Sequence, residues 1–151
     1  MNTVNAWLLE YNSLFKTNEK MYRDAVKSFG LSESAFWILY AIRNAPEGIT
    51  QREIINMNFL PPQTINSALK KLEAEGYVQL SAGADRRTKQ VFLTAKGNEL
   101  AAASADALIG IEVQASEQLT TEEKREFLRI FSKYISAVQV LLAGRFQEDA
   151  E

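Results

Sequence analysis

Hydrophobic side chains recur at helical spacing over residues 5–29, where Trp7, Leu14 and Met21 stand seven residues apart. A second series one position further along the chain widens the apolar stripe into a broad face. This pattern predicts one long amphipathic helix that ends at Gly30.

Further helices are predicted on both sides of the centre of the chain. Ser32 is placed to cap a helix that continues to the Pro-Glu-Gly turn at residues 46–48. Thr94 can cap an alanine-rich helix over residues 95–118. Thr120 then opens a Thr-x-x-Glu capping box, which predicts a last apolar helix to about Arg145.

The centre of the chain predicts two short helices joined by a turn. Thr50 and Glu53 form another capping box, which favours a helix over residues 51–56. A double proline ending at Pro62 sets the start of the second helix, because proline fits the first helical position. That helix is expected to end at Gly76.

Two alternating runs follow, over residues 77–82 and 89–94. Val78 and Val91 should face the same side of the resulting hairpin. The hairpin tip reads Gly83-Ala84-Asp85-Arg86-Arg87-Thr88-Lys89. The order helix, turn, helix and hairpin is typical of a winged helix-turn-helix, which places one helix in a DNA major groove.

The second short helix separates apolar from polar side chains. At 100° per residue, Ile65, Ala68, Leu69 and Leu72 fall on one predicted buried face. The opposite face and its flanks are polar or basic: Gln63, Thr64, Asn66, Ser67, Lys70 and Lys71. Amides pair with adenine edges and lysine donates to guanine, so this face fits base reading.

The amino-acid composition limits the catalytic and metal-binding chemistry that the chain can perform. The chain has no Cys and no His, which removes disulfides, thiolate metal sites, the usual general base and the commonest metal ligand. No clustered pair of carboxylates offers an alternative active site. We therefore expect no catalytic residues, no metal and no cofactor. Thiol oxidation and His-based metal sensing are excluded as regulatory triggers.

The net charge of −2 is unusual for a nucleic-acid binder. Residues 49–94 hold six basic and four acidic side chains, whereas the rest of the chain holds eleven and fifteen. Charge is therefore segregated mildly toward the predicted DNA-binding lobe. Charges also interrupt the apolar runs, and the N-terminus lacks a basic signal region, so we expect a cytoplasmic protein without a membrane partner.

The hairpin carries a family signature. Asp85-Arg86-Arg87 opens a D-x-R motif that is followed after five residues by Leu93-Thr94, and Leu60-Pro61-Pro62 precedes it. Together with the order of helices, this pattern resembles the MarR family of bacterial transcriptional regulators over nearly the whole chain. The resemblance implies a mainly α fold with a small β-hairpin wing and long N- and C-terminal dimerisation helices.

The resemblance also implies roles for residues of the wing. Arg87, with Arg86, would enter a minor groove, with Lys89 beside them, while Asp85 would hold the loop in shape. The expected assembly is a homodimer on a pseudo-palindromic operator, acting as a repressor. Residues 1–151 would form one domain, with a winged lobe over about 31–94 and dimerisation helices over about 5–29 and 95–145.

One position departs from the family. Members commonly carry a basic residue on the outward face of the recognition helix where this chain has Ser67. Direct base reading is therefore expected to depend more on Lys70, on Gln63 and on DNA shape.

Family members often respond to small, frequently phenolic ligands bound between the dimer arms and the winged lobe. Four aromatic side chains are candidates for such an effector pocket: Tyr11, Phe15, Trp37 and Tyr40. Aromatic residues at helical spacing also serve as ordinary core.

Two alternatives remain open. A winged-helix scaffold can serve as a protein-interaction adaptor without specific DNA binding, which the acidic balance and Ser67 would suit. The apolar terminal helices could also belong to a larger monomeric core instead of a dimer interface.

Overall fold

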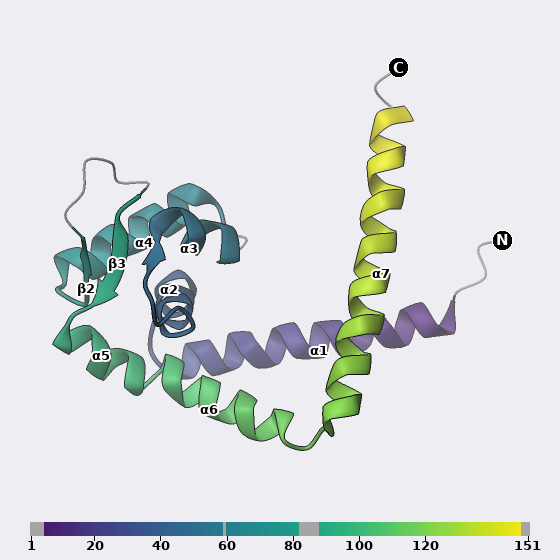
Figure 1. Cartoon of the computed structure of the whole chain (residues 1–151), viewed down its shortest axis with the longest axis horizontal. Coiled ribbons are helices and arrows are strands. Elements are labelled where there is room, and N and C mark those ends of the chain that lie inside the picture. The colour runs from purple at the N-terminus through teal and green to yellow at the C-terminus, as the bar shows by residue number, and fades with distance from the viewer. Residues whose placement is uncertain (1–4, 59, 82–87, 149–151) are drawn as a thin grey trace. The chain divides into compact units, whose positions relative to one another are not determined.

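A computed structural model of the protein describes residues 5–58, 60–81 and 88–148. In this part of the chain the elements follow in the order α1 (Ala6–Ser28), α2 (Glu33–Arg43), β1 (Ile49–Thr50), α3 (Gln51–Asn58), α4 (Pro62–Ala74), β2 (Val78–Leu80), β3 (Gln90–Leu93), α5 (Ala95–Ala102), α6 (Ala105–Ser116) and α7 (Thr121–Glu148). Figure 1 shows this mainly helical fold with its small sheet.

The predicted helix caps are confirmed. Ser32 accepts a hydrogen bond from the Ala35 N–H in the first turn of α2. Asn5, which was not predicted as a cap, accepts one from the Leu8 N–H at the start of α1. Thr120 and Glu123 bond each other's backbone N–H groups at the start of α7. Local side-chain chemistry therefore sets where these helices begin.

The helix-turn-helix is built on one hydrophobic core. Ile38 from α2, Ile54 from α3 and Ile65 from α4 are fully buried and belong to the same cluster as Val78 and Val91 of the sheet. The helix α3 is two residues longer than predicted and ends at Asn58. This shared core fixes α4 against its neighbours and leaves one side of it facing outward.

The sheet has three antiparallel strands in the order β1-β3-β2. Val78 pairs with Leu93, and Leu80 pairs with Val91, so the predicted hairpin and its apolar face are confirmed. The strand β1 was not predicted: Ile49 pairs with Val91 on the other edge of β3. Figure 1 shows the β2–β3 hairpin beside α4.

The predicted single helix over residues 95–118 is wrong, because α5 ends at Ala102 and α6 begins at Ala105. The Ser104 hydroxyl donates to the Leu100 carbonyl oxygen at 2.6 Å, and the Ser104 N–H bonds the Ala101 carbonyl three residues back. Ser104 is almost fully buried. Ala101 and Ala105 on either side are fully buried, so the two helices meet at a buried point that has no proline or glycine.

The described chain divides into two compact units, residues 1–109 and 110–151. In the first unit, the C-terminal half of α1 packs on α2, where Val26 and Phe36 are buried together with Leu108. The second unit contains α7, whose stretch Thr121–Arg145 has the length and composition of a membrane-crossing helix and is not buried. The core helices of soluble proteins can have the same length and composition.

Candidate nucleic-acid interface

The helix α4 has the two faces that the sequence predicts. Ile65, Leu69 and Leu72 are buried in the core of the lobe. Most of the predicted DNA-contact side chains on this helix are exposed: Gln63, Thr64, Ser67, Lys70 and Lys71. Because the buried face anchors the helix, the exposed face is presented to solvent on a rigid support.

Asn66 differs from the other predicted contacts on α4. It is half-buried, and its side-chain oxygen accepts a hydrogen bond from the Gln51 amide of α3. This bond ties the two helices of the helix-turn-helix together. This bond uses one lone pair of the Asn66 oxygen, so base contact by Asn66 would rely on its NH₂ donors and on the second lone pair.

The cap of α3 contributes to the same support. The Thr50 N–H donates to Glu53 Oε2 at 2.7 Å, and the Thr50 hydroxyl donates to the same oxygen at 2.8 Å. These two bonds, the backbone one first, lower the pKa of the Glu53 carboxyl below its ordinary value. The capping box thus holds the first turn of α3 next to strand β1.

The two lysines on the outward face of α4 have different surroundings. Lys71 Nζ lies 4.0 Å from Glu75 Oε1, one turn further along the helix, and both side chains are largely exposed. Such a pair is weak in water and releases the lysine readily to a phosphate. Lys70 is exposed beside the polar side chains of the same face.

The base of the wing is closed by hydrogen bonds between the two strands. The Ser81 N–H donates to the Gln90 carbonyl oxygen at 2.8 Å, and the Gln90 N–H donates to the Ser81 hydroxyl at 3.0 Å. Lys89 is half-buried next to this base. Asp85, Arg86 and Arg87 lie outside the described residues, so their roles stay predictions.

The predicted Thr94 cap of α5 is confirmed, but the contacts that join α5 to the chain after α4 were missed by sequence reasoning. The Thr94 hydroxyl donates to the Gly76 carbonyl oxygen at 2.6 Å and accepts from the Gly97 N–H at 3.0 Å, so it caps α5 and holds the end of α4 at once. Lys96 Nζ donates to the Glu75 carbonyl oxygen at 2.8 Å and lies 4.3 Å from the centre of the Tyr77 ring.

Gly97 makes this junction possible. A Cβ atom at that position would lie 1.8 Å from the Tyr77 carbonyl oxygen. The first turn of α5 therefore approaches the chain between α4 and the wing as closely as backbones allow. A glycine three residues after a helix cap was the available sequence signal.

The four aromatic candidates for an effector pocket fall into two ring pairs. Tyr11 and Phe15 stack on α1 with ring centres 6.1 Å apart. Trp37 and Tyr40 meet edge to face on α2 at 5.2 Å, and both pack against the core cluster around Phe36. The structure thus brings each pair together, and gives Trp37 and Tyr40 a packing role.

The carboxylates of the described residues form no group of three or more that could hold a metal ion.

The sequence is similar to one protein family and to several transcriptional regulators. Residues 29–88 match the model of the MarR family. The HTH-type transcriptional regulator YwoH of Bacillus subtilis is 26% identical over 136 residues, which cover 89% of this chain and 98% of that protein. The HTH-type transcriptional repressor Rv2887 of Mycobacterium tuberculosis is 29% identical over 110 residues, or 72% and 78% of the two chains. These relatives are regulators and not enzymes.

Solved structures share the fold. The MarR family regulator NMB1585 of Neisseria meningitidis matches with a TM-score of 0.80 at 17% identity, covering 93% of this chain and 99% of that one. The MepR–DNA complex of S. aureus matches with a TM-score of 0.67 at 23% identity, covering 85% and 96%. MarR of Staphylococcus aureus with salicylate and kanamycin matches with a TM-score of 0.61 at 15% identity, covering 88% and 90%.

Three findings point to the same kind of protein. They are the helix-turn-helix with its hairpin, the match to the family model, and the similarity to a regulator of nearly the same length. Residues 29–88 thus match the MarR family, and the chain as a whole is similar to HTH-type transcriptional regulators and shares its fold with a MarR family regulator.

Proposed function

We propose that the chain binds double-stranded DNA as a homodimer, with α4 in the major groove and the wing in the minor groove, and that it represses transcription. The observation that carries this proposal is the outward face of α4, which is polar and basic above a buried apolar face. A helix of this kind, presented by a helix-turn-helix, has the shape and donors that major-groove reading requires.

Each residue of the proposed interface has a physical role. Gln63 and Asn66 offer amides to adenine edges, and Lys70 donates to guanine. The hydroxyls of Thr64 and Ser67 serve bases or phosphates, and Lys71 neutralises a phosphate. In the wing, the proposed contacts to the minor groove come from Arg86, Arg87 and Lys89, with Asp85 shaping the loop.

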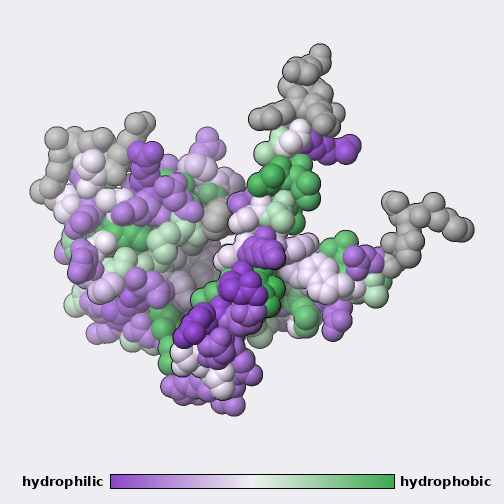
Figure 2. All heavy atoms as spheres, turned by 45° about the vertical axis from the view of Figure 1, so that its right-hand side comes forward, coloured by the Kyte–Doolittle hydropathy of each residue, from purple (hydrophilic) through white to green (hydrophobic). Residues whose placement is uncertain are grey.

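The proposal of a homodimer is supported by apolar side chains that the chain itself leaves uncovered. On α1, Trp7 and Leu14 are 54% and 66% exposed, and on α7 Val140 and Leu141 are 71% and 74% exposed. Figure 2 shows hydrophobic atoms open to solvent along the outer part of α7. Large exposed apolar side chains that gather on a long helix are typical of an interface, and a second copy can supply matching helices.

The relatives support the regulatory part of the proposal. Rv2887 is named a transcriptional repressor, and a MepR structure of the same fold contains DNA. A solved MarR structure of this fold contains salicylate, which supports a small organic ligand as the releasing signal. Such a ligand would use the aromatic side chains Tyr11, Phe15, Trp37 and Tyr40. Action on chromosomal DNA places the proposed site of function in the cytoplasm.

The test is a salt titration of DNA binding. Duplexes are first selected by the wild-type protein from fragments of the source genome, and gel shifts are then measured at several salt concentrations. Lys70→Ala should weaken binding and relax sequence preference, costing about 1–3 kcal/mol. Arg87→Ala should weaken all duplexes and reduce the slope of log affinity against log salt by about one. Lys16→Ala on α1 is the matched control and should bind as the wild type.

Selection of no duplex, or equal binding by wild type and both variants, would contradict DNA reading by this face. The second candidate function, a protein-interaction adaptor, is favoured by the net charge of −2 and by Ser67. It predicts capture of a protein partner without enrichment of genomic DNA.

A further inference from the structure

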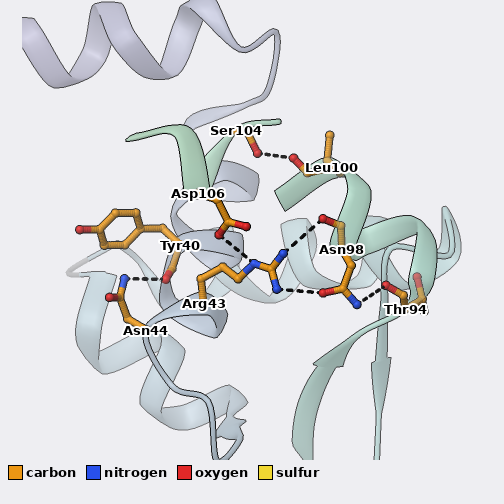
Figure 3. Close-up of polar contacts among 8 residues, drawn as sticks. All are labelled: Tyr40, Arg43, Asn44, Thr94, Asn98, Leu100, Ser104 and Asp106. Atoms are coloured by element: carbon orange, nitrogen blue, oxygen red, sulfur yellow. Dashed lines mark hydrogen bonds and ion pairs between the residues drawn. The ribbon is translucent and has the colours of Figure 1, made fainter. Parts of the chain in front are cut away.

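Arg43, the last residue of α2, connects three helices through one guanidinium group (Figure 3). Its Nη1 donates to Asn98 Oδ1 at 2.9 Å, and its Nη2 donates to the Asn98 carbonyl oxygen at 3.3 Å. Its Nε lies 2.9 Å from Asp106 Oδ1. The planar fork of arginine suits this arrangement, because its two terminal nitrogens reach two different oxygens of Asn98 while Nε lies beside Asp106.

This contact differs from the other ion pairs in the described part of the chain. The pairs Lys20–Asp24, Lys71–Glu75, Arg125–Glu122 and Arg129–Glu126 join residues three or four positions apart on a single helix. Arg43 and Asp106 belong to separate helices, and their side chains are only 27% and 41% exposed. Nε is itself buried, and its N–H is not aligned well enough with the carboxylate for a hydrogen bond, so charge attraction holds the pair.

The guanidinium spans the break between α5 and α6. Asn98 lies on α5 before the break at Ala103 and Ser104, and Asp106 lies in the first turn of α6 after it. A break of two residues can change its angle through a few backbone dihedrals. Arg43 contacts both sides, so the angle between the two helices is held from outside the break.

The same network reaches the end of α4. The Asn98 amide donates to the Thr94 carbonyl oxygen at 3.0 Å, and the Thr94 hydroxyl donates to the carbonyl oxygen of Gly76, two residues after the end of α4. Figure 3 shows the part of this path from Asp106 through Arg43 and Asn98 to Thr94. The start of α6 is therefore connected by consecutive polar contacts to the proposed recognition helix.

We propose that Arg43 is a positioning residue for DNA reading, which clamps the α5–α6 break and fixes the direction in which α6 leaves the winged lobe. The inference rests on the proposed function, because α6 leads from the first compact unit into the second. In a homodimer joined through the terminal helices, that direction sets the separation of the two recognition helices. The clamp thereby limits which spacings between half-sites the dimer accepts.

The first experiment measures the clamp without DNA. Because the chain has no cysteine, Gln79→Cys on β2 and Ala107→Cys on α6, both at exposed positions, take spin labels only where intended. Double electron–electron resonance then gives the distribution of the distance between the two labels, with labelled chains diluted in unlabelled protein. Arg43→Met should broaden this distribution, because the break is no longer held from α2.

The second experiment measures the consequence for DNA. Duplexes selected by the wild-type protein are altered by inserting or removing one or two base pairs between the half-sites. The wild type should lose about tenfold or more in affinity at each change, since half-site spacing is set by the dimer geometry. Arg43→Met should bind the best duplex more weakly and lose less than about threefold on changing the spacing. A loss of stability alone would lower affinity without flattening this dependence.

Three variants serve as controls. Arg125→Met removes an exposed pair within α7 and should match the wild type in both experiments. Arg43→Lys keeps the positive charge beside Asp106 but lacks the planar guanidinium that bonds Asn98. Because one of the two contacts remains, its distance distribution should be narrower than that of Arg43→Met. Asp106→Ala releases the clamp from the other side, and it replaces Arg43→Met if that variant does not fold.

The outcomes separate the two proposals. An unchanged distance distribution in Arg43→Met and Asp106→Ala, or a spacing dependence equal to that of the wild type, would overturn the clamp. A wild-type protein that selects no duplex would overturn the proposed function, and the spin-label result would then decide the clamp alone.

Discussion

The winged lobe and the terminal helices use apolar side chains in opposite ways. In the lobe, Ile65 and Val91 are fully buried by residues of the same chain. On α7, Val140 and Leu141 are more than two-thirds exposed. The lobe thus carries its own core, whereas α7 has large exposed apolar side chains that the proposed homodimer would bury. Stability of the lobe and assembly of the protein should therefore respond to different substitutions.

The largest expected effect concerns the terminal helices. Phe127→Glu combined with Leu141→Glu should raise the dissociation constant of the dimer by about a hundredfold or more. Each large apolar side chain contributes about 1.5–3 kcal/mol when buried, and 1.4 kcal/mol corresponds to a factor of ten. Sedimentation over a range of concentrations measures this change.

Lys133→Glu, a charge reversal at an exposed position of the same helix, is the control and should leave assembly unchanged. Wild-type protein that stays monomeric, or associates with lipid vesicles in a flotation assay, would contradict a dimeric role for α7.

Next to the lobe, at the start of α5, Gly97→Ala should be the most damaging small substitution. The added Cβ would lie 1.8 Å from the Tyr77 carbonyl oxygen, which belongs to the backbone and has little room to move. We expect a loss of about 3 kcal/mol or more in the free energy of unfolding. Chemical denaturation followed by circular dichroism checks it, and an unfolding curve equal to that of the wild type would refute the close approach.

Gly110→Ala is the same substitution at a position where the added Cβ has room. Gly110 lies inside α6, and a Cβ there would have no neighbouring atom of the chain within 4 Å. Alanine favours helix over glycine by about 0.5–1 kcal/mol, so this variant should be slightly more stable than the wild type. Thermal melting measures the gain, and a lower midpoint would indicate that a second molecule occupies this space.

The smallest effect is the pH dependence of the α3 cap. The Thr50 N–H and hydroxyl lower the pKa of Glu53 in the folded state. The cap therefore stabilises the lobe above the ordinary value of 4.5, and this contribution is lost as the pH falls through the lowered pKa. Glu53→Gln should be less stable than the wild type near neutral pH, and the difference should shrink in acid. A stability difference that grows in acid would contradict the lowered pKa of Glu53.

Local patterns of the sequence were sufficient for most helices. Ile65, Leu69 and Leu72 were assigned to the buried face of α4 from helical spacing alone, and the structure confirms this. Ser32 and Thr120 were assigned as caps because their partners lie three residues away in the sequence. Such features depend on neighbours along the chain, which a sequence shows directly.

Features made by distant residues were not predictable in the same way. The strand β1 is two residues long and overlaps a capping box, so no alternation marks it. The break at Ser104 is buried, and no proline or glycine marks it in the sequence. Arg43 meets Asn98 and Asp106 from far along the chain, and no local pattern connects these three residues.

The central claim is that two copies of the outward face of α4 read one DNA duplex. Hydroxyl-radical footprinting on a duplex selected by the wild-type protein tests it most directly. The account predicts two protected patches separated by about one helical turn, or roughly 10 base pairs, both weakened by Lys70→Ala. A single patch, or two patches that Lys70→Ala leaves unchanged, would contradict it.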